Sequence, residues 1–218
     1  MGRLTAYRDR RHAGEVLAEL LLDYQGAEVL VLAVPRGGVP VALPVVEALG
    51  CALDLIIPRK IGAPGQTELA IGAVCEDGEV LLNRRLVQSL GVSDEYIRSA
   101  AAGEVAEITR RLAVYRGGRS PAMLSGRRVI VIDDGVATGF TLNAALQSVA
   151  RHKPQELVLA VPVGPPESLA MLAREADKVV CPLQPEPFWS VGQFYRCFDQ
   201  LEDSDVRGLL RQAWNDTK

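Results

Sequence analysis

Two adjacent carboxylates, Asp133 and Asp134, stand in the part of the sequence with the clearest chemical meaning. They follow an apolar run, 129–132, typical of a strand buried on both faces, and precede a small, hydroxyl-rich turn, 135–141. Backbone N–H groups at a loop entering a helix can bind an anion, and glycine lets the backbone approach it closely. Carboxylates instead suit sugar hydroxyls or a hydrated Mg²⁺. An ordinary strand, turn and helix is the alternative, but the ordered pattern favours a sugar phosphate site.

This stretch resembles the phosphoribosyl diphosphate (PRPP) signature of the type I phosphoribosyltransferases. In that signature four apolar residues, an acidic pair and a short spacer precede Thr-Gly-x-Thr, here residues 138–141. Gly135 departs from it, because the family usually has a larger aliphatic residue there. The resemblance implies that Asp133 and Asp134 bind the ribose hydroxyls and act as catalytic residues. It assigns the 5′-phosphate to Val136, Ala137, Thr138, Gly139, Phe140 and Thr141.

The resemblance also implies a cofactor, Mg²⁺. The metal would be bound through the substrate, with water-bridged contacts to Asp133 and Asp134, and not by protein ligands alone. This agrees with the preference of Mg²⁺ for oxygen ligands and for keeping several of its waters.

A second loop, Pro-Arg-Gly-Gly at residues 35–38, follows the strand predicted over residues 28–34. A glycine pair between a strand and a helix exposes N–H groups to an anion, and Arg36 can add a bidentate phosphate contact. The equivalent loop of the family binds pyrophosphate, so the resemblance assigns Arg36, Gly37 and Gly38 to PRPP binding. Such turns are common, and the motif gains its weight from the acidic pair.

Arg59 and Lys60 follow the strand predicted over 53–57 and open a glycine- and proline-rich stretch, 58–72, which we predict to be a loop. Such a loop can close over a leaving pyrophosphate and exclude water. The family has a mobile catalytic loop in this place, which assigns Arg59 and Lys60 to PRPP and makes Lys60 catalytic. Glu68 is a further acidic candidate. A solvated surface loop is the alternative.

The acceptor is indicated by weaker features. Ala137 stands where the hypoxanthine–guanine enzymes carry an acidic general base, and residues 59–67 are similar to the adenine enzymes, although residues 72–76 do not complete that pattern. Phe188 and Trp189 lie in the most aromatic stretch of the chain and can stack on a planar base. Packing of these rings against the core is at least as good an explanation.

Composition narrows the class of protein. The 218 residues are 48% hydrophobic and 23% charged, as in ordinary globular domains. A net charge of −3 gives no basic field for nucleic acid, and we expect the arginines of residues 98–119 on a solvated helix face. The four cysteines lack metal-ligand spacing, no secretory leader is visible, and no apolar run approaches a membrane span. We therefore expect a cytoplasmic protein without membrane or nucleic-acid partners.

Strands and helices alternate along the chain. Strands are predicted at residues 28–34, 53–57, 129–132, 157–163 and 178–181, a hairpin at 70–74 and 80–82, and helices at 13–24, 39–49, 94–115, 142–150 and after 165–166. This order favours an α/β fold with a doubly wound, mostly parallel sheet. By resemblance it is the type I phosphoribosyltransferase fold, with a small hood from the chain ends. We expect one domain over 1–218, with its core at about 28–182 and its hood at 1–27 and 183–218.

The resulting hypothesis is a pentosyltransferase (a glycosyltransferase) of nucleotide metabolism. It would bind PRPP with Mg²⁺ and transfer the phosphoribosyl group to a nitrogenous base with release of pyrophosphate. Its partners would be small molecules, and a homodimer is compatible with the sequence. The alternative is a non-catalytic regulator on the same fold that senses PRPP or a nucleotide.

Overall fold

The computed structural model of the protein describes residues 5–26 and 28–215. Within these residues, five strands form a parallel sheet in the order β2-β1-β6-β7-β8. The strands are β1 (Val29–Ala33), β2 (Ala52–Leu55), β6 (Arg128–Ile132), β7 (Glu156–Ala160) and β8 (Lys178–Val180). The chain adds β2 on one side of β1 and the later strands on the other, so the strand order reverses between β1 and β6. The predicted α/β fold with a mostly parallel sheet is confirmed.

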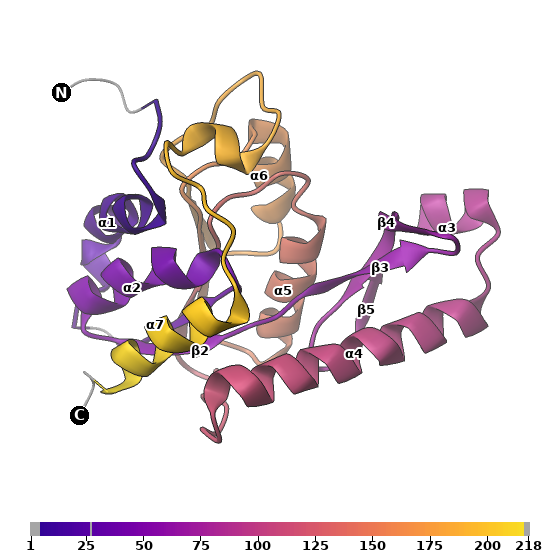
Figure 1. The fold of residues 1–218 in the computed structure, drawn as a ribbon, viewed down its shortest axis with the longest axis horizontal. Helices are drawn as coiled ribbons and strands as arrows, with labels where there is room; N and C mark the ends of the chain where they lie inside the picture. Colours follow the sequence, from indigo (N-terminus) through magenta and orange to yellow (C-terminus); the bar gives the residue numbers. More distant parts are fainter. Residues whose placement is uncertain (1–4, 27, 216–218) are drawn as a thin grey trace.

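Helices cover both faces of this sheet (Figure 1). One face carries α1 (Arg10–Leu20), α2 (Gly38–Leu49) and α7 (Asp203–Asn215), and the other carries α5 (Phe140–Arg151) and α6 (Pro166–Leu172). Successive strand residues point to opposite faces, so Val31 packs in the cluster of α2 while Leu30 and Leu32 pack in the cluster of α5. Burial on both faces explains why β1 and residues 129–132 of β6 are continuous apolar runs.

Both ends of the first helix differ from the prediction. The first helix was expected over 13–24, but α1 begins at Arg10, because the Asp9 carboxylate accepts a hydrogen bond from the His12 N–H as an N-cap. It ends at Leu20 and is followed by a short 3₁₀ turn, Leu22–Tyr24. The earlier start matters, because it makes Arg10 the first residue of a helix.

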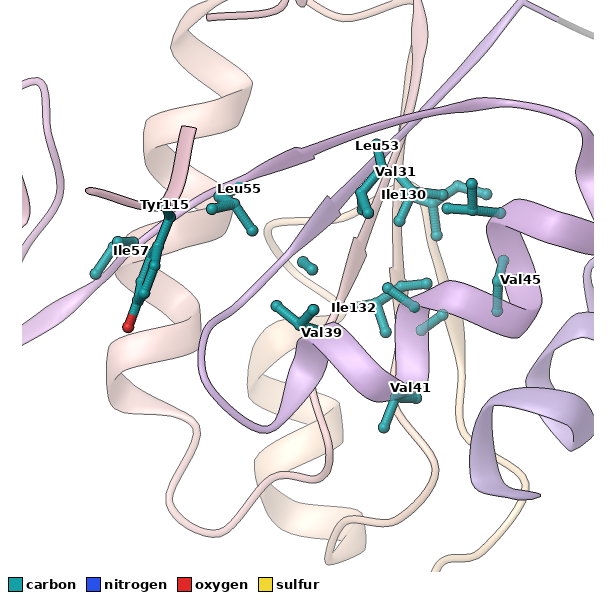
Figure 2. Close-up of a cluster of buried hydrophobic side chains, with 14 of the residues drawn as sticks. Val31, Val39, Val41, Val45, Leu53, Leu55, Ile57, Tyr115, Ile130 and Ile132 are labelled. Carbon is teal, nitrogen blue, oxygen red and sulfur yellow. The ribbon is translucent and has the colours of Figure 1, made fainter. Parts of the chain in front are cut away.

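A core cluster joins the parallel sheet to α2 and to the end of the long helix α4 (Asp94–Arg116). Figure 2 shows Val39 of α2 near Ile132 of β6, Val45 further along the same helix, and Tyr115 of α4 near Leu55 of β2. All five side chains are buried. Because α2 begins where the loop after β1 ends, this packing holds that loop in place.

A second, antiparallel sheet extends to one side of the molecule with α3 (Arg84–Leu90) and α4 (Figure 1). Its strands, among the described residues, are β3 (Arg59–Ala63), β4 (Gln66–Val74) and β5 (Val80–Leu82). The pairing of β4 with β5 confirms the predicted hairpin. The loop predicted over 58–72 is wrong, because these residues form the β3–β4 hairpin.

The glycines of that hairpin led to the prediction of a loop. In the structure they lie at the turn and at a bulge of the hairpin. Pro64 and Gly65 form the turn, and Gly65 has a φ of 71°, which glycine adopts without steric cost. Gly62 lies at a register shift, where a Cβ would come 2.5 Å from the carbonyl oxygen of Thr67. The Tyr96 hydroxyl donates to the Gly62 carbonyl oxygen at 3.1 Å, which ties the hairpin to α4.

One arginine of α4 is not on the solvated face expected for it. Arg116 is buried, and its Nε donates to Asp54 Oδ1 of β2 at 2.9 Å. Glu76 lies 3.5 Å from the same guanidinium group. Arg110 and Arg119 are exposed as predicted.

The two chain ends meet above the parallel sheet. Tyr7 forms a parallel bridge with Tyr195, and the Tyr7 N–H donates to the Phe194 carbonyl oxygen at 2.7 Å. The hydroxyl groups reach the carboxyl ends of two strands: Tyr7 donates to the Pro162 carbonyl oxygen at 2.7 Å, and Tyr195 donates to the Asp134 carbonyl oxygen at 2.6 Å. We call the two paired segments, around Tyr7 and around residues 191–195, the cap. The cap confirms the small hood expected from the chain ends.

The division of the single domain 1–218 into a core at 28–182 and a hood at 1–27 and 183–218 stays a prediction. Across residues 5–26 and 28–215, no helix combines the length and the apolar character needed to cross a membrane. All four cysteines are free thiols.

Candidate functional site

The loops after β1 and β6 lie side by side where the strand order reverses. Ala33 pairs with Ile132, and the Val34 N–H donates to the Ile132 carbonyl oxygen at 2.8 Å. Gly38, the first residue of α2, packs against the same strand end, where a Cβ would lie 2.6 Å from that oxygen. Open α/β sheets bind ligands at this kind of position, outside the carboxyl ends of the strands. Residues 35–38 and the acidic pair therefore lie together at the edge where a ligand would bind.

Asp133 and Asp134 follow the last residue of β6, and the Asp134 N–H donates to Asp133 Oδ1 at 2.8 Å. Burial raises the pKa of Asp133 well above its usual range, and the neighbouring Asp134 carboxylate raises it further. Burial also raises the pKa of Asp134, although the Arg10 guanidinium opposes that rise. The protein alone therefore disfavours the ionised form of the pair, and hydroxyl donors or a cation would stabilise that form.

Sequence reasoning missed Arg10. Its Nε donates to Asp134 Oδ2 at 2.8 Å, and its Nη1 donates to the Asp199 carbonyl oxygen at 2.8 Å. Its Cζ also lies 3.8 Å from the centroid of the Phe198 ring, a cation–π contact. Arg10 and Asp134 are 124 positions apart, so no local pattern in the sequence connects them.

Arg10 and Arg36 line one groove of about 430 Å³ together with Gly37 and residues 198–201. Arg36 Nη1 is 3.7 Å from Asp203 Oδ1, a loose ion pair. Two guanidinium groups beside a glycine pair form a favourable environment for an anion with several charged oxygens. The structure thus brings the predicted residues of loop 35–38 to the acidic pair.

Loop 136–141 runs from the acidic pair to α5 and is anchored at two points. The Val136 N–H donates to the Val163 carbonyl oxygen at 2.8 Å. The Ser168 hydroxyl of α6 donates to the Ala137 carbonyl oxygen at 2.6 Å. Segments after β7 therefore hold the loop in position.

The N-terminus of α5 is open to an anion. The helix begins at Phe140 without a side-chain N-cap, and Gly139 before it has a left-handed conformation with φ 73°. Ala137 and Thr138 are exposed in front of this helix end. Helix N-terminal N–H groups bind anions, and the hydroxyls of Thr138 and Thr141 are further donors.

Gly135, the departure from the family signature, is enclosed by the cap. A Cβ on residue 135 would lie 2.6 Å from Cγ1 of Val191 and 3.0 Å from Cγ1 of Val163. Val191 is the first residue of the 3₁₀ turn η2 (Val191–Phe194), which belongs to the cap. A larger residue at 135 therefore does not fit beneath this cap.

Phe188 and Trp189 line a groove of about 810 Å³ together with Ala137 and Thr138. Trp189 is 82% exposed, whereas Phe188 is partly buried and stacks on Phe194 with ring centroids 5.4 Å apart. The structure therefore brings both predicted base-binding residues beside loop 136–141. Asp133 and Asp134 are not among the described residues that line this groove.

Arg59 and Lys60 lie on β3 of the antiparallel sheet. Arg59 forms an ion pair with Glu104 of α4. Lys60 Nζ lies 2.6 Å from Glu68 Oε2 across the hairpin, and the Glu68 side chain is 91% exposed. Among the described residues, neither cation contacts Asp133 or Asp134, so their roles at a substrate stay predictions.

The chain has clear similarity to known proteins. Residues 5–196 match the family model described as the phosphoribosyl transferase domain. A Mycobacterium tuberculosis H37Rv protein named "Putative phosphoribosyl transferase Rv0571c" is 41% identical over 210 residues, which are 96% of this chain and 47% of the relative. The chain thus spans about half the length of the curated relatives it matches.

Solved structures show the same similarity. The protein TT1426 from Thermus thermophilus is 41% identical with a TM-score of 0.80, and the match covers 95% of this chain and 98% of that one. AQ2163 from Aquifex aeolicus, at 12% identity and a TM-score of 0.51, covers 84% and 78% of the two chains and shares the fold.

The family model covers the sheet, the acidic pair and both loops beside it. The chain therefore belongs to the phosphoribosyl transferase domain family, and its α/β fold is that of the type I members.

Proposed function

We propose that the chain binds PRPP with Mg²⁺ and transfers its phosphoribosyl group to a nitrogenous base, with release of pyrophosphate. The observation that carries the proposal is the convergence of three features where the strand order reverses: loop 35–38, the acidic pair and loop 136–141. Together they match the chemistry of a donor that has a diphosphate, a diol and a phosphate. Membership of the phosphoribosyl transferase family supports the same reaction class.

The two ends of the donor have separate places in this arrangement. Loop 136–141 and the N-terminus of α5 would bind the 5′-phosphate, because uncapped N–H groups and threonine hydroxyls donate to its oxygens. Asp133 and Asp134 would accept hydrogen bonds from the ribose hydroxyls. Arg10 engages Oδ2 of Asp134, and a carboxylate has acceptor capacity left for a sugar hydroxyl.

The residues present fit a magnesium ion carried by the substrate. Among the described residues, no cluster of three or more His, Cys, Asp or Glu side chains could hold a metal ion. The two carboxyl groups still supply hard oxygen donors, and a cation would stabilise their ionised form, which burial disfavours. When bound, Mg²⁺ would neutralise diphosphate oxygens, and Asp133 and Asp134 would contact it through water.

The protein's part in the reaction would be positioning and charge neutralisation. Fixing the ribose and the 5′-phosphate orients C1′, and loop 35–38 with Arg36 would take up the charge of the departing pyrophosphate. The groove of Phe188 and Trp189 would accept a planar base by stacking. A nitrogen of that base would form the new bond to C1′ as the bond to pyrophosphate breaks.

Transfer to a panel of acceptors tests the proposal. The protein is incubated with PRPP, Mg²⁺ and purine, pyrimidine and pyridine bases, and mass spectrometry detects any nucleotide. We expect a product that disappears when Asp133→Asn and Asp134→Asn are combined, while Asp94→Asn with Glu95→Gln, an exposed acidic pair on α4, keeps it. Unchanged PRPP affinity in the first double variant contradicts the site. PRPP binding without any product would favour the sensor alternative.

Thr138→Val tests loop 136–141 separately. Loss of a hydroxyl donor to the 5′-phosphate should weaken nucleotide binding by about 1–3 kcal/mol. Equal nucleotide affinity in this variant and the wild type would remove Thr138 from the proposed site.

A further inference from the structure

Arg10 is held more rigidly than a surface arginine. Asp9 caps the helix that begins at Arg10. The guanidinium group of Arg10 contacts Asp134, the Asp199 carbonyl oxygen and the Phe198 ring. Its side chain is 13% exposed. Immobilising an arginine costs rotamer entropy. Because contacts within the protein already fix Arg10, a ligand that binds it would lose less of this entropy.

The packing of α1 on α2 fixes the distance between Arg10 and loop 35–38. Gly14 of α1 touches α2 so closely that a Cβ would lie 2.2 Å from the Val41 carbonyl oxygen and 3.0 Å from the Pro44 ring. Because α2 begins at Gly38, directly after that loop, α1 and the loop are parts of one packed unit. Arg10 and Arg36 therefore line the same groove as a consequence of helix packing.

The charges around the groove leave room for an anion. Arg10 is paired with Asp134, and the ion pair of Arg36 with Asp203 is loose, at 3.7 Å. The Asp199 carboxylate is turned to the Cys197 thiol, which donates to it at 2.9 Å. Within residues 5–26 and 28–215, Nη2 of Arg10 donates no hydrogen bond, so the guanidinium keeps donors for a ligand.

We propose that Arg10 is a second diphosphate-binding residue, which donates to the leaving pyrophosphate while it holds Asp134. This inference rests on the proposed function and adds a residue from the first helix to the groove of Arg36. Planar fork geometry makes such bridging possible, because an arginine offers five N–H donors in one plane. The Arg10 side chain would then contact both Asp134, which binds the ribose, and the pyrophosphate that leaves the ribose.

Inorganic pyrophosphate tests this directly, because it contains the leaving group without the sugar. Isothermal titration calorimetry at fixed Mg²⁺ would compare the wild type with Arg10→Met, Arg10→Lys and the matched control Arg11→Met. Arg11 is the next residue of the same helix, and its exposed side chain pairs with Glu15 and Glu47. We expect Arg10→Met to weaken pyrophosphate binding roughly 10-fold or more, which is the scale of a charge-assisted hydrogen bond. Arg10→Lys should keep part of the affinity.

Ribose 5-phosphate separates direct contact from a purely positioning role. If Arg10 acted only by holding Asp134, Arg10→Met would weaken ribose 5-phosphate and leave pyrophosphate unchanged, and that result overturns the inference. Pyrophosphate affinities of Arg10→Met and Arg10→Lys within about twofold of Arg11→Met overturn it as well. So does a wild type that does not bind pyrophosphate.

These outcomes are independent of the transfer assay. If transfer occurs but pyrophosphate affinity does not depend on Arg10, only this inference fails. If pyrophosphate affinity depends on Arg10 but no base accepts the phosphoribosyl group, the diphosphate-binding role of Arg10 stands and the proposed transfer reaction fails. Thermal unfolding of each variant shows whether it is folded, and Arg10→Lys keeps the charge beside Asp134 should Arg10→Met not fold.

Discussion

The carboxylate of Asp134 occupies the space where a side chain on residue 37 would lie. A Cβ on Gly37 would come 1.8 Å from Oδ2 and 2.3 Å from Cγ of Asp134. Gly37 has φ −63° and ψ −33°, a conformation open to every residue, so glycine is required here for space and not for backbone geometry. The loop after β1 and the carboxylate after β6 are in contact only because residue 37 has no side chain.

Gly37→Ala should therefore damage the donor site without abolishing folding. The added methyl must displace the Asp134 carboxylate, and overpacking of this kind costs about 1–3 kcal/mol. We expect PRPP affinity, measured by calorimetry, to fall roughly 10- to 100-fold. Gly103→Ala on the exposed face of α4 is the matched control, because a Cβ there meets nothing within 4 Å. Equal PRPP affinity in the two variants would contradict the contact.

Gly135 and Val191 should be energetically coupled. Gly135→Ala places a methyl against Val191 and Val163, and we expect a loss of about 1–3 kcal/mol in the free energy of unfolding. Val191→Ala opens part of that space, so the double variant should be more stable than the sum of the single changes predicts, by about 0.5 kcal/mol or more. Urea unfolding of the four proteins gives this coupling. If the losses in unfolding free energy of the two single variants are strictly additive, Val191 does not restrict the side chain at residue 135.

The parts of the site that could be predicted from sequence are those encoded locally. The acidic pair, loop 136–141 and loop 35–38 each follow a short apolar run, and parallel strands bring their carboxyl ends to one edge. The strand pattern was therefore enough to place these loops together. Family resemblance then assigned their ligands, and the alternation of strands and helices predicted the fold class.

What could not be predicted depends on contacts between distant segments or on ambiguous residues. Arg10 reaches Asp134 across 124 positions, and only the packing of α1 on α2 and the pairing of the chain ends bring them together. Glycine and proline in residues 58–72 suit a loop and a bulged hairpin equally well, and tertiary contacts with α4 decide between the two. Arg116 looked like a surface charge because its partner Asp54 is 62 positions away.

The Arg116–Asp54 pair should be important for stability. Their side chains are 9% and 8% exposed, and Asp54 also accepts hydrogen bonds from the N–H groups of Leu55 and Ala122, each at 2.8 Å. Arg116→Met leaves the buried carboxylate without its counter-ion, and we expect a loss of about 3–5 kcal/mol in the free energy of unfolding.

The surface pair of Arg110 and Glu107 provides the comparison for Arg116. The Arg110 side chain is 57% exposed, and solvent screens its charge, so Arg110→Met should cost far less than Arg116→Met. Urea titrations of both variants give the two values. Similar losses in the two would mean that burial of the Asp54 pair does not set its energy.

The stability contributed by Asp77 should depend on pH. Asp77 lies in the turn between β4 and β5 and accepts hydrogen bonds from Ser148 at 2.8 Å and from Arg151 at 2.6 Å. Burial tends to raise the pKa of this carboxyl, but the hydrogen bonds from Arg151 and Ser148 outweigh it and lower the pKa. A depressed pKa in the folded state means that the stabilisation is complete above the unfolded pKa and is lost as the pH falls through the folded value.

Asp77→Asn should therefore destabilise the protein at neutral pH and cost progressively less as the pH falls below about 4, the ordinary range for an aspartate. At pH 7 we expect a loss of about 1 kcal/mol, because solvent screens an Arg151 side chain that is 42% exposed. Guanidinium unfolding at pH 7, 5 and 3 measures the difference, with Glu19→Gln on the exposed side of α1 as the control. A difference that stays constant from pH 7 to pH 3 would show that the charge on Asp77 does not hold the β4–β5 turn against α5.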